Sequence, residues 1–158
     1  MSSTSAVSAT PESTVIYTEK LWPTAWIWLI ALGLSVAGIL MFIPISTFAG
    51  YAAAVIMFIL QAVILVTSTP RIEVTTDSLQ VGRAHISREY IGEVTAFRGD
   101  AATAERGPRL NGLSYLCIRG WINPIVKIEI TDETDRTPYW LASSRRPEKL
   151  VAALTRGR

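Results

Sequence analysis

The sequence predicts an α+β membrane protein, in which a two-helix transmembrane hairpin precedes a small antiparallel β domain closed by a C-terminal helix. Three observations predict this fold class. The fifty residues 21–70 contain no Asp, Glu, Lys, Arg or His. After them, apolar and polar residues alternate with the period of a β-strand. Finally, Leu150, Val151 and Leu154 form the apolar stripe of an amphipathic helix.

The first twenty residues, 1–20, are predicted to be a disordered cytoplasmic tail. The stretch "MSSTSAVSATPEST" consists mostly of small and polar residues. Such a composition offers too little apolar surface to offset the entropy cost of ordering the chain. We therefore expect the folded part to begin with the apolar residues after this tail.

The hairpin is predicted to occupy residues 21–69, with spans at about 24–43 and 49–66. A helix of roughly 20 apolar residues crosses the hydrocarbon core of a bilayer. Turn-forming residues lie between the two spans, at Pro44, Ser46, Thr47 and Gly50. Lys20 and Arg71 flank the pair, whereas the turn is uncharged. Basic residues stay on the cytoplasmic side, which predicts a multi-pass inner-membrane protein with both termini in the cytoplasm.

Small residues recur four positions apart within the spans, as they do where membrane helices approach closely. Gly33 with Ala37 and Gly50 with Ala54 are the two pairs, and Gln61 is the strongly polar side chain of the spans. We expect the small residues to pack between the two helices or against another membrane protein. Gln61 is expected to form a hydrogen bond across the hairpin or to reach toward the inner interface.

The remaining residues, 70–158, are predicted to form a cytoplasmic β domain. Short alternating segments with turns between them favour a sheet that curls on itself. The expected strands are a hairpin over 71–81 and strands at about 93–98, 113–119, 122–131 and 137–143. A helix over about 145–155 follows, with Ser144 as its N-cap.

Strands followed by one C-terminal helix, directly after two spans, resemble the bacterial membrane-flanked pleckstrin-homology-like (PH-like) domains in layout. A closer resemblance is carried by "RGW" at 119–121, "TPYWLASSRRPEKL" at 137–150 and "RIEVTTDSLQVGRAHIS" at 71–87. These runs are similar to an actinobacterial family of two-span membrane proteins, the domain of unknown function 3093. The resemblance covers nearly all of residues 17–154. It implies the architecture and an actinobacterial source, and it carries no activity.

The residue inventory argues against an enzyme, a metal site or a cofactor. A single cysteine and a single histidine permit neither an intrachain disulfide nor a His/Cys metal cluster. We expect His85 to lie on a solvated strand face and Cys117 to be a packed thiol. The run "TDETD" at 131–135 is expected to be a solvated acidic turn. We therefore predict no catalytic, metal-binding or cofactor-binding residues.

Four arginines are the candidate contacts for an anion or a partner. Arg145 and Arg146 are expected in the first turn of the last helix, where the helix dipole disfavours cations. They either pair with the acidic turn or hold a phosphate or lipid headgroup. Arg106 and Arg109 lie in the long segment 99–112, which is expected to be either a mobile loop or a contact site.

The leading functional hypothesis is a non-enzymatic inner-membrane protein that serves as an interaction, accessory or assembly module of a larger membrane complex. The alternative is a membrane-anchored PH-like sensor of anionic lipid or phosphate. The expected partners are the lipid bilayer, such a complex, and a second copy of the chain. Nucleic acid is not expected, because a net charge of +3 (14 basic minus 11 acidic residues after Pro70) forms no basic stripe.

Overall fold

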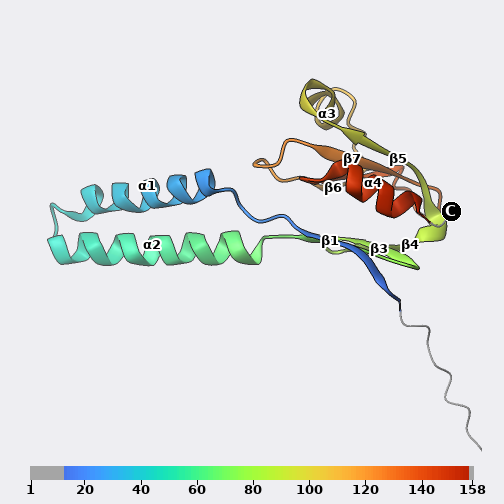
Figure 1. Ribbon diagram of the computed structural model, residues 1–158. Coiled ribbons are helices and arrows are strands. Elements are labelled where there is room, and N and C mark those ends of the chain that lie inside the picture. The colour runs from blue at the N-terminus through green and yellow to red at the C-terminus, as the bar shows by residue number, and fades with distance from the viewer. Residues whose placement is uncertain (1–12, 157–158) are drawn as a thin grey trace, which may run out of the picture.

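A computed structural model describes residues 13–156 and shows a helical hairpin attached to a β domain (Figure 1). The hairpin consists of α1 (Ala25–Phe42) and α2 (Thr47–Thr67), which lie side by side and extend away from the β domain. Their mean hydropathies are 2.2 and 2.3, and only 11% and 6% of their most apolar stretches are buried within the chain. Both helices are thus long and apolar enough to cross a membrane, and their bounds lie close to those of the predicted spans.

The two helices pack on each other at α2 residue Gly50, as predicted, but not at Gly33. Gly50 is buried, and a Cβ atom added there would lie 3.2 Å from the carbonyl oxygen of Ile39. Gly33 and Ala37 are exposed, and nothing lies within 4 Å of a Cβ added at Gly33. Their prediction as packing residues within the hairpin was wrong, because the face of α1 that meets α2 carries the buried residues Ala31 and Ser35 instead.

The other predicted packing residues of the hairpin lie on α2. Ala54 and Gln61 are both half-buried. An aromatic contact between Trp28 and Phe58, with ring centroids 6.5 Å apart, also joins the two helices. The hairpin is therefore held together by small residues near its turn and by aromatic rings nearer to the β domain.

The first sheet contains β1 (Val15–Lys20), β2 (Arg71–Thr75), β3 (Ser78–Val81) and β4 (Ala84–Ser87), antiparallel and in this order. β1 corrects the prediction that the disordered tail reaches residue 20. Residues 1–12 of that predicted tail lie outside the described residues. The segment "VIYTEK" is rich in residues that favour strands. It pairs with β2 so that Lys20 lies opposite Arg71.

The second sheet has the order β5-β7-β8-β6, with β5 at Ile91–Phe97, β6 at Tyr115–Cys117, β7 at Ile125–Ile130 and β8 at Tyr139–Ser143. Three of the predicted strands form the antiparallel part of this sheet. β6 pairs with β8 in parallel, which corrects the expectation of a wholly antiparallel sheet. The reason is that β6 does not form a hairpin with the next strand, β7, but lies on the far side of β8.

Residues 99–106 form a helix, α3 (Gly99–Arg106), where a mobile loop or contact site was expected. Its alanines favour a helix, and Ala102 is buried against Ile125, Tyr139 and Leu141 of the second sheet. In Figure 1, α3 lies over the face of this sheet that points away from the first sheet. The sheet is therefore covered on both faces.

The opposite face of the second sheet meets the first sheet in the main core, which α4 (Pro147–Thr155) closes. Leu150 and Leu154 are 0% and 2% exposed, as the predicted apolar stripe requires. At the C-terminal end of α4, Arg88 Nη2 donates to the carbonyl oxygens of Leu154 at 2.8 Å and Arg156 at 2.7 Å. The helix is thus part of the core and is fixed at its end by an arginine from outside it.

Strand β8 shows the predicted alternation, and both of its faces are buried. Tyr139 and Leu141 point toward α3, whereas Trp140 and Ala142 belong to the core between the sheets. The prediction that at least one of the two neighbouring aromatic residues is buried is confirmed, since both are. The "TPYWL" run consequently leads into β8, which is one of the two inner strands of the second sheet.

Candidate functional site

Five basic residues gather at the end of the β domain from which the two helices leave, which we call the helix-root face: Lys20, Arg71, Arg83, Arg119 and Arg145. Lys20 and Arg71 lie opposite each other in the last pair of β1 and β2. Lys20 Nζ lies 4.2 Å from the ring centroid of Trp22, in a cation–π contact. Arg145 donates a hydrogen bond to the carbonyl oxygen of Trp22. The chain therefore concentrates positive charge around the base of α1 and α2.

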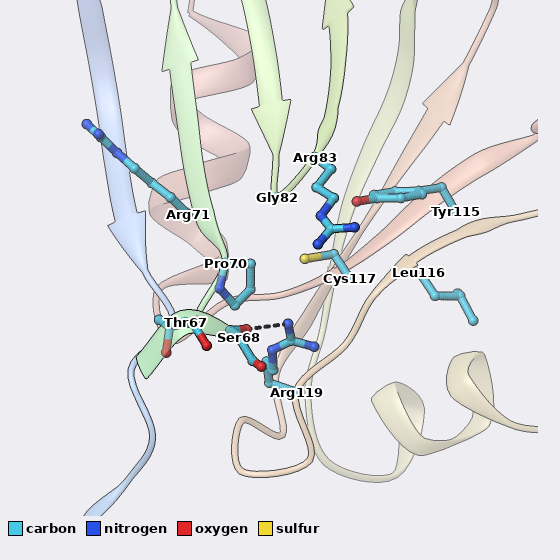
Figure 2. A pocket seen from close by; sticks show the side chains of 11 residues that line it. Thr67, Ser68, Pro70, Arg71, Gly82, Arg83, Tyr115, Leu116, Cys117 and Arg119 are labelled. Carbon is cyan, nitrogen blue, oxygen red and sulfur yellow. Dashed lines mark hydrogen bonds between the residues drawn. The ribbon is translucent and has the colours of Figure 1, made fainter. Parts of the chain in front are cut away.

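A cavity of about 400 Å³ opens on the helix-root face, beside the end of α2 (Figure 2). The residues after α2, the β3–β4 turn and strand β6 form its walls. No acidic residue is among the described residues that line it, which are Thr67, Ser68, Thr69, Pro70, Arg71, Gly82, Arg83, Tyr115, Leu116, Cys117 and Arg119.

Arg119 is held rigidly in the wall of the cavity. Its backbone N–H donates to Ser143 Oγ at 2.9 Å, and its Nη2 donates to the carbonyl oxygen of Ser68 at 2.7 Å. Ser68 follows the last residue of α2, so this bond satisfies a carbonyl at the negative end of the helix dipole. Nε of Arg119 is buried and has no hydrogen-bond partner among residues 13–156. Its Nη1 also donates to the carbonyl oxygen of Ile118 at 3.1 Å, so the guanidinium is fixed in place while its Nε donor stays unused.

Arg83 belongs to the β3–β4 turn, which needs Gly82 in the left-handed region, at φ 62°. Figure 2 shows its side chain extending into the cavity toward Cys117. Within the described part of the chain, Arg83 makes no hydrogen bond or ion pair. Arg71 differs, because it points away from Arg83 and pairs with Glu73 at 2.8 Å. Arg83 and Arg119 are therefore the cations that the cavity offers.

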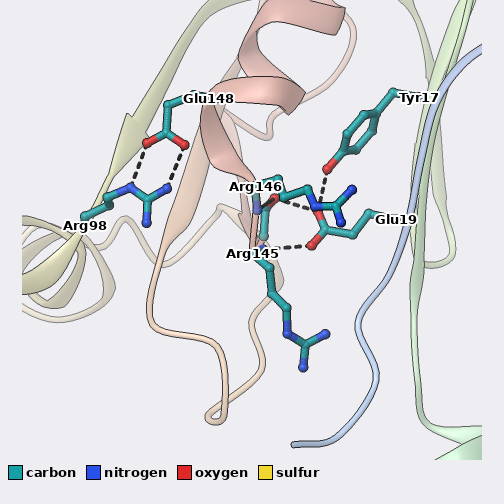
Figure 3. Close-up of polar contacts among 7 residues, drawn as sticks. Tyr17, Glu19, Arg98, Arg145, Arg146 and Glu148 are labelled. Atoms are coloured by element: carbon teal, nitrogen blue, oxygen red, sulfur yellow. Dashed lines mark hydrogen bonds and ion pairs between the residues drawn. The ribbon is translucent and has the colours of Figure 1, made fainter.

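A second polar group on this face joins β1 to the start of α4 (Figure 3). Glu19 accepts hydrogen bonds from the Ser144 hydroxyl at 2.6 Å, the Arg145 backbone N–H at 2.7 Å and the Tyr17 hydroxyl at 2.7 Å. Burial and the hydrogen bond to Glu19 raise the pKa of Tyr17 well above its ordinary value. Ser144 Oγ also accepts from the backbone N–H of Arg146 at 3.1 Å. The N-cap of α4 is Arg146, so the prediction of Ser144 as the N-cap was wrong, and Arg145 and Arg146 precede the first turn of the helix because it begins only at Pro147.

The predicted pairing of Arg145 and Arg146 with the acidic turn is wrong. Neither guanidinium forms an ion pair with a described residue. Asp132 and Asp135 precede β8 and the arginines follow it, so the five-residue strand separates the two groups by about 16 Å. The Asp132 carboxylate instead accepts hydrogen bonds from Thr134, 2.8 Å from its backbone nitrogen and 2.7 Å from its hydroxyl, which lowers the pKa of Asp132.

Arg106 and Arg109 lie at the end of α3 and in the turn after it. Arg106 Nε donates to the carbonyl oxygen of Ala102, and Arg109 pairs with Glu105 at 3.3 Å. Glu105 is only 4% exposed and also accepts from Lys127 at 3.0 Å. Burial alone would raise the pKa of Glu105, but the hydrogen bonds from Lys127 and Arg109 hold it below its ordinary value. Both arginines are thus engaged with α3 and its surroundings.

The remaining residues considered in the sequence, Cys117 and His85, do not form a catalytic or metal-binding group with other described residues. Cys117 is buried in β6, and burial raises the pKa of its thiol, as expected for a packed residue. His85 is exposed on β4. Across residues 13–156, no three His, Cys, Asp or Glu side chains lie close enough together to hold a metal ion.

The family described as "Protein of unknown function (DUF3093)" matches residues 16–154 of the chain. The chain belongs to the DUF3093 family. The DUF3093 match extends from β1 into α4, so it includes both apolar helices and both sheets. No curated protein and no solved structure matches the chain. The family resemblance is confirmed, whereas the actinobacterial source and the PH-like layout stay predictions.

Sequence reasoning identified Arg145 and Arg146 but missed the cavity cations Arg83 and Arg119. Arg83 was visible as a basic residue after the second apolar stretch. Arg119, in the "RGW" motif, lies 51 residues after Ser68 and reaches it through the fold. The motif itself was the usable signal, because the neighbouring Trp121 Nε1 also donates to a backbone oxygen at the helix base, that of Leu21, at 3.3 Å.

Proposed function

We propose that the chain is a non-enzymatic, two-span protein of the inner membrane that holds its β domain in a fixed orientation as a docking module for a larger membrane complex. Both termini would lie in the cytoplasm, with the helix-root face against the lipid headgroups. The hydropathy of α1 and α2 and the basic residues at their base support this placement.

The observation that carries the proposal is the way in which the hairpin joins the β domain. β1 leads into α1, α2 leads into β2, and these two strands pair with each other. Leu21 N–H donates to the Pro70 carbonyl at 3.1 Å, directly beyond the last strand pair. Both helices thus leave the same sheet at adjacent points. Such a double attachment restricts the domain far more than a flexible linker would.

The exposed pair Gly33 and Ala37 supports docking through the hairpin as well. These small residues face away from α2 and would permit another membrane helix to approach α1 closely. A second copy of the chain is one candidate for that helix, and a subunit of another complex is the other.

Two experiments test the proposal in intact cells. A phosphatase reporter fused after Arg158 should be inactive and a fluorescent protein there should fluoresce, since both termini are expected in the cytoplasm. A photoreactive amino acid at Ala37 should crosslink specifically to one membrane protein, whereas the same probe at Ala31, which is buried within the hairpin, should not. An active phosphatase would refute the topology, and the absence of any specific crosslink would refute docking through α1.

The alternative function, recognition of an anionic lipid or a phosphate, is favoured because no acidic residue is among the described residues that line the cavity. The residues that we propose for this recognition differ from those that the sequence predicted. Arg145 remains on the helix-root face beside Trp22, whereas Arg106 and Arg109 are engaged with α3.

A further inference from the structure

We propose that the cavity beside the end of α2 binds the phosphate group of an anionic lipid headgroup, with Arg83 and Arg119 as its ligands. The inference rests on the membrane placement given above and adds to it a defined ligand and two defined residues. It requires no docking partner.

The position of the cavity fits a lipid headgroup. The 21 residues of α2 correspond to about 31 Å of helix, which matches the thickness of the hydrocarbon core. Thr67, the last residue of α2, lines the cavity. If α2 spans the bilayer, the cavity therefore lies at the depth of the lipid phosphates.

The charge of the cavity fits a single phosphodiester. Arg71 is neutralised by Glu73, so Arg83 and Arg119 supply about two positive charges. The end of a helix carries roughly half a negative charge, and Arg119 contacts it at Ser68. The remainder is more than one positive charge. A phosphodiester brings one negative charge and accepts hydrogen bonds from guanidinium groups.

The fold provides hydrogen-bond partners for part of the Arg119 guanidinium, and the described residues provide none for the Arg83 guanidinium. Arg119 donates from Nη2 to Ser68 and from Nη1 to the carbonyl oxygen of Ile118 at 3.1 Å, but its Nε has no partner among residues 13–156. Arg83 likewise has no polar partner in the described part of the chain, although its side chain extends into the cavity (Figure 2). Two guanidiniums with unused donors in the lining of one cavity are the arrangement that an anion would complete.

The size of the cavity and its neutral donors also suit a headgroup. A volume of about 400 Å³ lies within the usual range of small-molecule sites. The hydroxyl of Ser68 makes no hydrogen bond within residues 13–156 and can donate to a phosphate oxygen. The hydroxyl of Tyr115 is not free for this, because it donates to the Val81 carbonyl at 3.0 Å.

The test uses the full chain, purified in mild detergent and stripped of lipid. Retention of added phosphatidylglycerol is measured by native mass spectrometry, with zwitterionic phosphatidylcholine as the reference lipid. Arg83→Gln is the main variant, because Arg83 makes no bond in the described fold and its loss should not unfold the protein. Arg119→Gln is the second, and Arg136→Gln, an exposed residue of the distal β7–β8 turn, is the charge-matched control.

We expect the wild-type chain and Arg136→Gln to retain one phosphatidylglycerol in preference to phosphatidylcholine, and Arg83→Gln to bind it about tenfold more weakly. Equal retention by wild type and Arg83→Gln, or equal retention of the two lipids, would overturn the proposal. Inorganic phosphate provides a separate arm. If it raises the thermal midpoint of the wild type in an Arg83-dependent manner while no lipid is retained, the ligand is a soluble phosphate compound and the lipid assignment is wrong.

This result and the docking experiment are independent of each other. Loss of the Ala37 crosslink leaves lipid retention unaffected, and loss of lipid retention leaves the crosslink unaffected. The two proposals can therefore fail separately.

Discussion

Glu19 and Ser144 lie 125 residues apart in the sequence, and the Ser144 hydroxyl donates a hydrogen bond of 2.6 Å to the Glu19 carboxylate. The backbone N–H of Arg145 donates to the other oxygen of the same carboxylate. One side chain before the hairpin thus fixes the start of the last helix. Because β1 also leads into α1, this contact ties the closing helix of the domain to the strand that enters the hairpin.

Glu19→Gln should destabilise the β domain by about 1–2 kcal/mol. An amide has one acceptor oxygen in place of two, so at least one of the donors from Tyr17, Ser144 and Arg145 loses its partner. Thermal unfolding of the full chain in detergent, followed by tryptophan fluorescence, measures the effect. Glu133→Gln, in the exposed acidic turn, is the control and should be close to wild type. Equal midpoints for the two variants would show that the Glu19 contact does not stabilise the fold.

Gly50→Val should disrupt the hairpin, whereas Gly33→Val should not. A Cβ at Gly50 would already lie 3.2 Å from the backbone oxygen of Ile39, and two further methyl groups would push the helices apart. Gly33 has open space around it in the isolated chain. The check is a crosslink between cysteines introduced on facing positions of α1 and α2, whose yield should fall only in the Gly50 variant. A comparable fall for Gly33→Val would contradict the observed face of α1.

Leu150→Ala should destabilise the β domain by about 2–5 kcal/mol, the usual cost of truncating a buried leucine. Leu150 is fully buried in the core that α4 closes, whereas its neighbour Lys149 is exposed. Lys149→Ala therefore serves as the matched control for the same helix and should change stability little. Chemical denaturation of the two variants compares them directly. If Leu150→Ala were as stable as the control, α4 would be an appendage rather than part of the core.

The contribution of Glu105 to stability should depend on pH. Lys127 and Arg109 lower the pKa of Glu105 in the folded state, so the unfolded chain takes up a proton at higher pH than the folded one. The stabilisation is therefore complete above the ordinary carboxyl pKa and is lost as the pH falls through the folded value. We expect Glu105→Gln to be less stable than wild type at neutral pH, and the difference to shrink below about pH 4. Asp100→Asn, exposed on the same helix, is the control. A difference that stayed constant over this range would refute the ion-pair assignment.

The architecture could be predicted where one local pattern decides it. The uncharged fifty residues gave both helices, and alternation gave the two buried faces of Tyr139 and Trp140. Strand β1 was missed because its side chains are mostly exposed and its order comes from pairing with β2, a partner more than fifty residues away. Composition favours disorder for such a segment unless the partner strand is known.

For the candidate site, the sequence predicted only that it would be positively charged. That basic residues would surround the helix base followed from their positions beside the apolar stretch. Which of these basic residues share a cavity depends on the path of β6. Strand β6 pairs with β8 in parallel, and the loop that follows β6 places Arg119 next to Ser68. No local pattern specifies a parallel neighbour of this kind. For the same reason, the expected partner of the Arg145 guanidinium was a turn near it in sequence rather than the carbonyl oxygen of Trp22, which lies between β1 and α1.

The pairing of β1 with β2 has a consequence for the biogenesis of the protein. β1 is synthesised before either helix and β2 after both. If α1 and α2 span the bilayer as proposed, the first sheet can close only when the ends of the hairpin lie on the same side of it. A chain whose second helix failed to return would leave these strands in different compartments, with Ile72 and Val74 deprived of their edge neighbour. Folding of the β domain would then report on correct insertion, and misinserted chains would present an unpaired strand to the quality-control proteases of the cell.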